Sequence, residues 1–204
     1  MSTMLHEPET ETGTAPLVLH FKPVLNLSEN EFFAFCQINR DLRIERTALG
    51  EIIVMAPAGF DSSGGNLELL RQLANWALQD RSGVARDSSC GYTLPNGSVR
   101  SPDASWVSNE RLKLLTKKQR QKFAPLCPEF VVELRSPSDR ISDLKAKMEE
   151  YIENGALLGL LIVPEKKRVY VYRPNQSVEQ LDHCETVSCE PVLPGFELML
   201  QEIC

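Results

Sequence analysis

The chain contains 204 residues, of which 42% are hydrophobic and 25% are charged, and its formal net charge is −6. This composition is typical of a globular protein with a substantial core, and it excludes fibrous, collagen-like and fully disordered classes. The net negative charge argues against a general nucleic-acid coat protein, although a local basic groove is compatible with it.

The first 16 residues are rich in Glu, Thr and Pro and lack hydrophobic periodicity. They predict a disordered tail ahead of one domain that spans residues 17–204. The tail lacks the pattern of a signal peptide, and no later segment approaches the roughly 20 consecutive apolar residues of a membrane helix. We therefore expect a cytoplasmic protein.

Residues 28–55 predict a short helix followed by a β-hairpin. Ser28 and Glu31 have the spacing of a capping box at the start of a short amphipathic helix. Residues 42–46 alternate and residues 51–55 are strand-like, so these two segments predict a hairpin. Glu45 lies on the face of the hairpin opposite its apolar residues.

A longer helix and two strands follow along the chain. Apolar residues in 67–77 have the spacing of an amphipathic helix, and residues 84–87 predict a short strand. Residues 99–107 predict a further strand that carries Pro102 and Asp103. Pro102 is compatible with this strand if it lies at a sheet edge or at the strand start.

A basic segment follows, with Glu110 as its only local acid. Its six basic residues are Arg111, Lys113, Lys117, Lys118, Arg120 and Lys122. The segment is either a solvated helical face or a surface for the DNA backbone, with Lys117 and Lys118 as candidate contacts.

The second half predicts a strand, a helix and a hairpin. Residues 129–135 form an apolar strand with Glu133 and Arg135 on one face. Asp139 caps a helix that runs to Asn154 and ends at Gly155, and the strands 157–163 and 168–173 form the hairpin. The alternation of strands and helices predicts one α/β domain with a mixed sheet flanked by helices.

Several chemistries are disfavoured by the positions of the relevant residues. The three histidines, at positions 6, 20 and 183, fall in the tail, just after it and in a late loop, which argues against a Ser-His-Asp triad. No phosphate-binding glycine loop is present. The six cysteines contain no Cys-x-x-Cys pair, and the cluster of His183, Cys184 and Cys189 lacks a fourth ligand, so we expect reduced thiols.

Two carboxylates occupy positions where a charge is costly to bury. Asp103 lies at a strand start and Glu133 lies inside an apolar strand. Burial of an ionised acid costs several kcal/mol unless a cation compensates. Such acids suit a Mg²⁺ or Mn²⁺ ion acting on a phosphodiester, with Arg135 able to bind phosphate. An ordinary salt bridge between Glu133 and Arg135 is the structural alternative.

These residues resemble a known nuclease superfamily. The Pro102-Asp103 pair is followed thirty positions later by Glu133, within the run from Val131 to Asp139. This pattern is similar to the PD-(D/E)XK nucleases and, more narrowly, to the bacterial Uma-two family of restriction-endonuclease-like proteins. The resemblance covers about residues 25 to 200.

The resemblance implies a restriction-endonuclease-like fold in which Asp103 and Glu133 are catalytic and bind the metal. The superfamily lysine two positions after the glutamate is Arg135 here, and the resemblance moves that role to Lys147. Helical spacing alone cannot choose between Lys145 and Lys147. Glu45 is a candidate for an additional metal ligand, and its alternative is an exposed hairpin charge.

The implied function is hydrolysis of DNA phosphodiester bonds by a Mg²⁺- or Mn²⁺-dependent endonuclease. The alternative is a catalytically inactive module of the same fold that binds nucleic acid or a protein partner. Restriction-like nucleases that cut both strands commonly need two active sites, so analogy also predicts a homodimer or a higher homo-oligomer.

Overall fold

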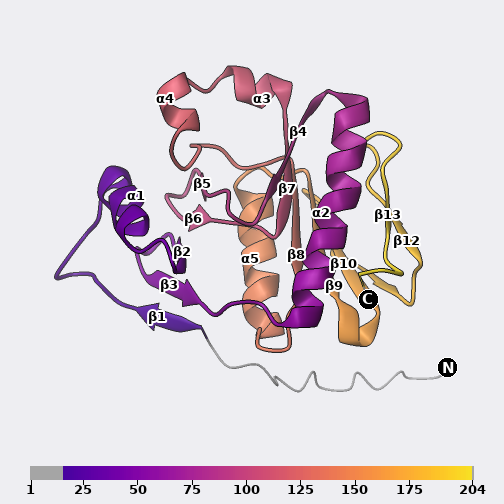
Figure 1. Cartoon of the computed structure of the whole chain (residues 1–204), viewed down its shortest axis with the longest axis horizontal. Coiled ribbons are helices and arrows are strands. Elements are labelled where there is room, and N and C mark those ends of the chain that lie inside the picture. The colour runs from indigo at the N-terminus through magenta and orange to yellow at the C-terminus, as the bar shows by residue number, and fades with distance from the viewer. Residues whose placement is uncertain (1–15, 204) are drawn as a thin grey trace.

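The computed structural model describes residues 16–203, and a six-stranded mixed sheet lies at its centre (Figure 1). The strand order is β11-β10-β9-β8-β7-β4, in which only β8 and β9 run parallel. The bounds are β4 Gly83–Asp87, β7 Ala104–Ser108, β8 Phe130–Leu134, β9 Leu158–Val163, β10 Arg168–Tyr172 and β11 Glu179–Asp182.

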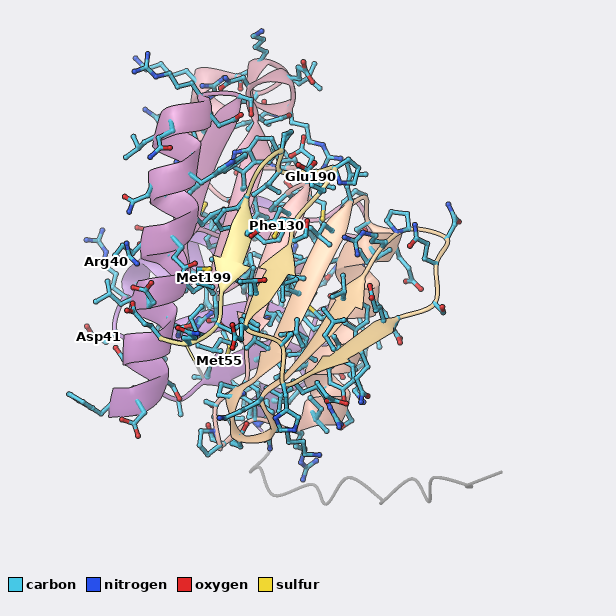
Figure 2. The ribbon with its side chains drawn as sticks, turned by 90° about the vertical axis from the view of Figure 1, so that its right-hand side faces the viewer. Arg40, Asp41, Met55, Phe130, Glu190 and Met199 are labelled. Atoms are coloured by element: carbon cyan, nitrogen blue, oxygen red, sulfur yellow. The ribbon has the colours of Figure 1, made fainter. Side chains whose placement is uncertain are left out.

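One face of this sheet is covered by helix α2 (Phe60–Asp80) and by the hairpin β12 (Thr186–Ser188) and β13 (Glu197–Met199). The alternation predicted for β8 is confirmed, because Phe130, Val132 and Leu134 all point into this core. Phe130 lies between the sheet and its cover, where its ring packs edge-on against Phe196 (Figure 2). Full burial of a large apolar side chain such as Phe or Leu stabilises the fold by about 1.5–3 kcal/mol.

The other face is covered by helix α5 (Ile141–Glu153), whose Met148 and Tyr151 are fully buried. Val131 and Glu133, the other set of β8 residues, lie on this side. Gly155 follows the helix with φ of 106°, so the predicted helix end is confirmed.

A second, antiparallel sheet has the strand order β1-β3-β2-β6-β5. Its bounds are β1 Leu17–Leu19, β2 Arg43–Arg46, β3 Ile52–Met55, β5 Tyr92–Thr93 and β6 Val99–Arg100. The predicted hairpin is therefore confirmed as β2 and β3, and helix α1 (Glu29–Ile38) starts at the predicted Ser28 capping box. Phe32 of α1 packs on this sheet.

The basic segment forms two short helices, α3 (Asn109–Lys113) and α4 (Lys117–Arg120), and a 3₁₀ turn, η1 (Pro164–Lys166), joins β9 to β10. The described helices include none with the length and apolarity needed to cross a membrane. The predicted tail falls on residues 1–15, which lie outside the described part of the chain, and on Pro16.

Two sequence predictions about local structure were wrong. Residues 99–107 do not form one strand, because β6 ends at Arg100 and β7 begins at Ala104 in the other sheet. Pro102 has no N–H, and the Ser101 N–H donates to Glu45. Neither residue therefore donates the backbone hydrogen bond that a continuous strand would need here. Asp139 does not cap α5, because its Oδ2 accepts from the Ser136 N–H and hydroxyl.

Candidate active site

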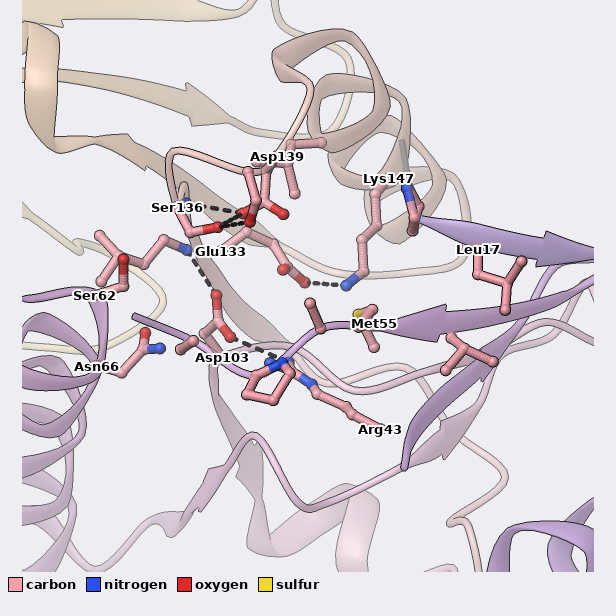
Figure 3. A pocket seen from close by; sticks show the side chains of 18 residues that line it. Leu17, Arg43, Met55, Ser62, Asn66, Asp103, Glu133, Ser136, Asp139 and Lys147 are labelled. Atoms are coloured by element: carbon pink, nitrogen blue, oxygen red, sulfur yellow. Dashed lines mark hydrogen bonds and ion pairs between the residues drawn. The ribbon is translucent and has the colours of Figure 1, made fainter. Parts of the chain in front are cut away.

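Asp103 and Glu133 meet at one edge of the central sheet. The antiparallel register of β7 and β8 pairs Ala104 with Val132, which brings the residues on either side of this pair together. Asp103 is 8% exposed and Glu133 is 3% exposed. Both line a cleft of about 380 Å³ together with Lys147 (Figure 3). The structure therefore brings together the three residues that the resemblance assigned to catalysis.

Asp103 is held by one amide and one cation. Its Oδ2 accepts the Leu134 N–H at 2.9 Å, and its Oδ1 lies 3.1 Å from Nη2 of Arg43. The same Arg43 nitrogen donates to the Ser101 carbonyl at 2.9 Å. These contacts fix the carboxylate at the cleft wall and offset its charge.

Glu133 is held through one of its two oxygens. Its Oε1 lies 2.8 Å from Nζ of Lys147 and accepts the Tyr151 hydroxyl at 3.0 Å. Lys147 and Tyr151 are four residues apart and thus share one face of α5. Glu133 Oε2 has no hydrogen-bond partner in residues 16–203, so it is the oxygen left for a ligand.

Glu45 is buried, with 2% exposure, so the alternative of an exposed hairpin charge was wrong. Its Oε1 accepts from Lys147 and from the Ser101 N–H, each at 2.9 Å, and its Oε2 lies 3.1 Å from Arg100. Arg100 in turn pairs with Glu150 at 2.5 Å. Glu45 lines an adjoining cavity of about 420 Å³ that also contains Lys147. Glu45 therefore forms a buried ion pair with Lys147.

The two carboxylates that share Lys147 differ in their protonation. Burial raises the pKa of Glu133 to about 7, with Asp103 and Glu45 also raising it and Lys147 opposing them. Burial also acts to raise the pKa of Glu45, but Lys147 and Arg100 outweigh it and the net pKa is lowered. Burial acts to lower the pKa of Lys147, whereas Glu133 and Glu45 outweigh that effect and raise it. Lys147 therefore remains an ammonium ion between the two acids.

The donor set of Asp103 and Glu133 fits a small divalent cation. Mg²⁺ takes hard oxygen ligands, often only one or two carboxylates, and fills its remaining positions with water and substrate phosphate. Burial is the largest cause of the raised pKa of Glu133, and the charge of Asp103 adds to it, so a cation between the two acids would offset both effects. No cluster of three or more His, Cys, Asp or Glu side chains in residues 16–203 is arranged to hold a metal, so most ligands would come from water and substrate.

Arg135 and Lys145 lie away from the acids. Arg135 pairs with Glu165 of η1 and donates to the Asp139 carbonyl at 3.2 Å, and it does not line the cleft. Nζ of Lys145 lies 4.4 Å from the centre of the Tyr170 ring. Glu133 is thus paired with Lys147 and not with Arg135, and of the two α5 lysines it is Lys147 that reaches the acids.

The basic segment lies at the far end of β7 from Asp103 (Figure 1). Arg111 pairs with Glu129 at 3.0 Å, Arg120 donates to the Leu112 carbonyl, and Lys122 donates to Asn30 at 2.5 Å. These three side chains have structural partners. The remaining three, Lys113, Lys117 and Lys118, are exposed.

The sequence prediction missed three residues of the site. Arg43 lies two positions before Glu45 on one strand face, and Tyr151 lies one helical turn after Lys147, so periodicity alone indicates both. Arg100 follows from no local pattern, because its partner Glu45 is 55 positions away in sequence.

This is an α/β protein in which Asp103 and Glu133, at the edge of a mixed sheet, share one cleft with Lys147 of helix α5. The profile of the Uma2 family, described as "Putative restriction endonuclease", matches residues 29–201, and the chain belongs to this family. The fold is similar to that of a crystal structure described as "a putative nuclease belonging to DUF820" from Anabaena variabilis. That match has a TM-score of 0.69 and 19% identity, and it covers 87% of this chain and 97% of the other. No curated protein matches the sequence.

Proposed function

We propose that this protein is a Mg²⁺- or Mn²⁺-dependent endonuclease that hydrolyses DNA phosphodiester bonds. The observation that carries the proposal is the convergence of Asp103, Glu133 and the ammonium group of Lys147 in one cleft. Family membership and the similarity to a structure described as a nuclease support it.

In this proposal Asp103 and Glu133 hold the metal. When bound, the divalent ion neutralises charge on the phosphoryl oxygens and provides an activated water. Glu133 would hold the metal through its unpaired Oε2, while Tyr151 and Lys147 fix the orientation of the same carboxylate through Oε1. Fixing a ligand by hydrogen bonds from neighbouring groups is a usual requirement of metal sites.

Lys147 provides the second positive charge beside the phosphodiester. Its ammonium group stabilises the negative charge that develops on phosphorus-bound oxygens as water attacks and the P–O bond breaks. Glu45 and Arg100 hold this lysine at the cleft, because Glu45 accepts from both. Glu45 lines the adjoining cavity and not the cleft that contains Asp103 and Glu133, so we assign Glu45 to the lysine rather than to the metal.

The proposal also includes contacts to the DNA backbone and an assembly of two subunits. A phosphodiester of DNA approaches from the open side of the cleft, with Lys117 and Lys118 as proposed backbone contacts. Arg135 is the remaining proposed phosphate contact, and it would have to exchange its pairing with Glu165. Cleavage of both strands of a duplex requires two such clefts, so we also propose a homodimer.

Single-turnover cleavage of plasmid and single-stranded DNA in Mg²⁺ and in Mn²⁺ tests the function. The wild type should cut in either ion, whereas Asp103→Asn and Glu133→Gln should lose at least about 10²-fold in rate. Light scattering of the free protein and of its DNA complex measures the assembly. A wild type that binds DNA but never cuts it would favour the alternative of a non-catalytic binding module.

A further inference from the structure

Asn66 carries a polar group without a partner on the wall of the cleft that faces Asp103. Its Oδ1 is buried and accepts no hydrogen bond. The rest of its carboxamide also makes no hydrogen bond to any residue in 16–203. Buried polar groups in native proteins are nearly always paired, so the orphan oxygen indicates a missing donor such as water, and the NH₂ group is left for an acceptor in the cleft.

The backbone places this side chain with precision. Helix α2 approaches β8 so closely that a Cβ on Gly65 would lie 2.9 Å from Cδ2 of Leu134. Leu134 is the residue whose N–H donates to Asp103, and Asn66, which follows Gly65 on α2, lines the same cleft as Asp103. Figure 3 shows the amide nitrogen of Asn66 on the side of Asp103, with Ser62 one turn earlier on the same wall.

A structural role does not explain this asparagine. It lies inside α2, beyond the N-cap at Gly59, so it caps no backbone group. In a helix interior asparagine is less favourable than alanine. The residue therefore reduces local helix stability and gains no hydrogen bond within residues 16–203.

Arg43 faces the same cleft from the opposite side. The two hydrogen bonds of Arg43 to the described protein are both donated by Nη2, one to the Ser101 carbonyl and one to Asp103 Oδ1. Its Nε is buried without a partner, and Nη1 makes no hydrogen bond to residues 16–203. The cleft between Asn66 and Arg43 thus has N–H donors on both walls.

We propose that the Asn66 carboxamide binds the phosphodiester in this cleft, with its NH₂ group donating to a phosphoryl oxygen while Arg43 contacts the same group from the other wall. This inference rests on the proposed nuclease function. An amide donor suits a phosphoryl oxygen beside two carboxylates, because it adds a hydrogen bond without adding charge. The Asn66 oxygen accepts from water that accompanies the substrate.

The test compares Asn66→Ala with Asn75→Ala, an exposed asparagine on the same helix. Binding of a fluorescent oligonucleotide is measured in Ca²⁺, a cation chosen to occupy the metal site while slowing cleavage. Asn66→Ala should weaken binding about tenfold, as expected for loss of a charge-assisted hydrogen bond, and Asn75→Ala should bind as the wild type does. Equal affinity of all three proteins overturns the inference.

Thermal unfolding separates this role from a structural one. Because Asn66 makes no hydrogen bond in residues 16–203 that alanine would lose, Asn66→Ala should raise the Tm while it weakens binding. A lowered Tm together with weakened binding would mean that Asn66 supports the fold, which overturns the inference.

Asn66→Asp distinguishes phosphate from metal as the ligand of this position. A carboxylate cannot donate and repels phosphate, so this variant should bind the oligonucleotide more weakly than Asn66→Ala. If instead Asn66→Asp binds Mg²⁺ more tightly in calorimetry without DNA, the position faces the metal and the phosphate role is wrong.

The outcome for the wild type separates this inference from the nuclease proposal. If the wild type cuts DNA and Asn66→Ala cuts and binds equally well, only the Asn66 inference fails. If the wild type neither binds nor cuts DNA, the nuclease proposal fails and the Asn66 inference fails with it. If the wild type binds without cutting and Asn66→Ala binds more weakly, the phosphate contact stands and the hydrolytic activity does not.

Discussion

The ammonium nitrogen of Lys147 lies 2.8 Å from Oε1 of Glu133, although the two residues come from different elements. Arg135 stands only two residues after Glu133, but its side chain pairs with Glu165. The cation beside the glutamate therefore comes from the helix that packs over the strand.

Replacement of Lys147 should affect chemistry more than binding. Lys147→Ala should lower the single-turnover cleavage rate by about 10² or more, because the phosphodiester loses a positioned cation. Lys145→Ala is the matched control on the same helix, and we expect it to cut at close to the wild-type rate. Circular dichroism checks the fold of each variant. The reverse order of the two rates would mean that Lys145 serves the cleft.

Metal binding should depend on both cleft acids. We expect Mg²⁺ and Mn²⁺ to raise the Tm of the wild type by mass action, and calorimetry should show at least about tenfold weaker binding in Asp103→Asn and Glu133→Gln. Glu153→Gln, an exposed acid at the end of α5, is the control and should leave the affinity unchanged. Equal affinity in Asp103→Asn and the wild type would contradict this assignment of ligands.

The stability of the metal-free protein should fall as pH rises from about 5 to about 8. Glu133 has a pKa of about 7 in the folded protein against an ordinary value of 4.5, so the folded state binds the proton more tightly. Its contribution is complete below pH 4.5 and is lost as pH rises through 7. Glu133→Gln stays uncharged and should lack this component. The Tm of each protein across this pH range, measured with a chelator present, gives the comparison, and parallel curves would contradict the shifted pKa.

Much of the fold was predictable because local rules and packing agree. The capping box at Ser28, the hairpin around Glu45 and the helix end at Gly155 all depend on contacts between near neighbours in sequence. The alternation of β8 was predictable for a related reason, since its two faces pack against α2 and α5.

Other features depended on long-range partners that local patterns do not show. The break between Arg100 and Ala104 arises because the Ser101 N–H binds Glu45, which lies in a distant part of the sequence. The choice between Lys145 and Lys147 depends on which edge of α5 lies toward β8, and that is set by tertiary packing. Asp139 is a reasonable cap by composition, but the N–H and hydroxyl of Ser136, three residues earlier, donate to its carboxylate instead.

Charge reversal on α4 tests the proposed DNA-backbone contact. The double variant Lys117→Glu and Lys118→Glu should weaken binding similarly for different DNA sequences and reduce the dependence of affinity on salt, because phosphate contacts release counterions. Replacement of the same two residues by Gln should have a smaller effect of the same sign. An unchanged affinity and salt slope in both variants would identify α4 as a solvated surface.

Two neighbouring glycines test the close approach of α2 to the site. A Cβ on Gly64 meets no atom within 4 Å, whereas a Cβ on Gly65 would lie 2.9 Å from Leu134 and 3.2 Å from the Ile203 carbonyl oxygen. Gly64→Ala should therefore raise the free energy of unfolding by up to about 1 kcal/mol, as helix propensity predicts. Gly65→Ala should lower it by about 1–3 kcal/mol, because the helix must shift away from β8. Denaturant unfolding measures both values. Equal stabilisation by the two substitutions would contradict the tight contact.

The same pair of variants should differ in DNA binding. Since the shift of α2 also moves Asn66 relative to Asp103, Gly65→Ala should weaken DNA binding, while Gly64→Ala should leave it unchanged.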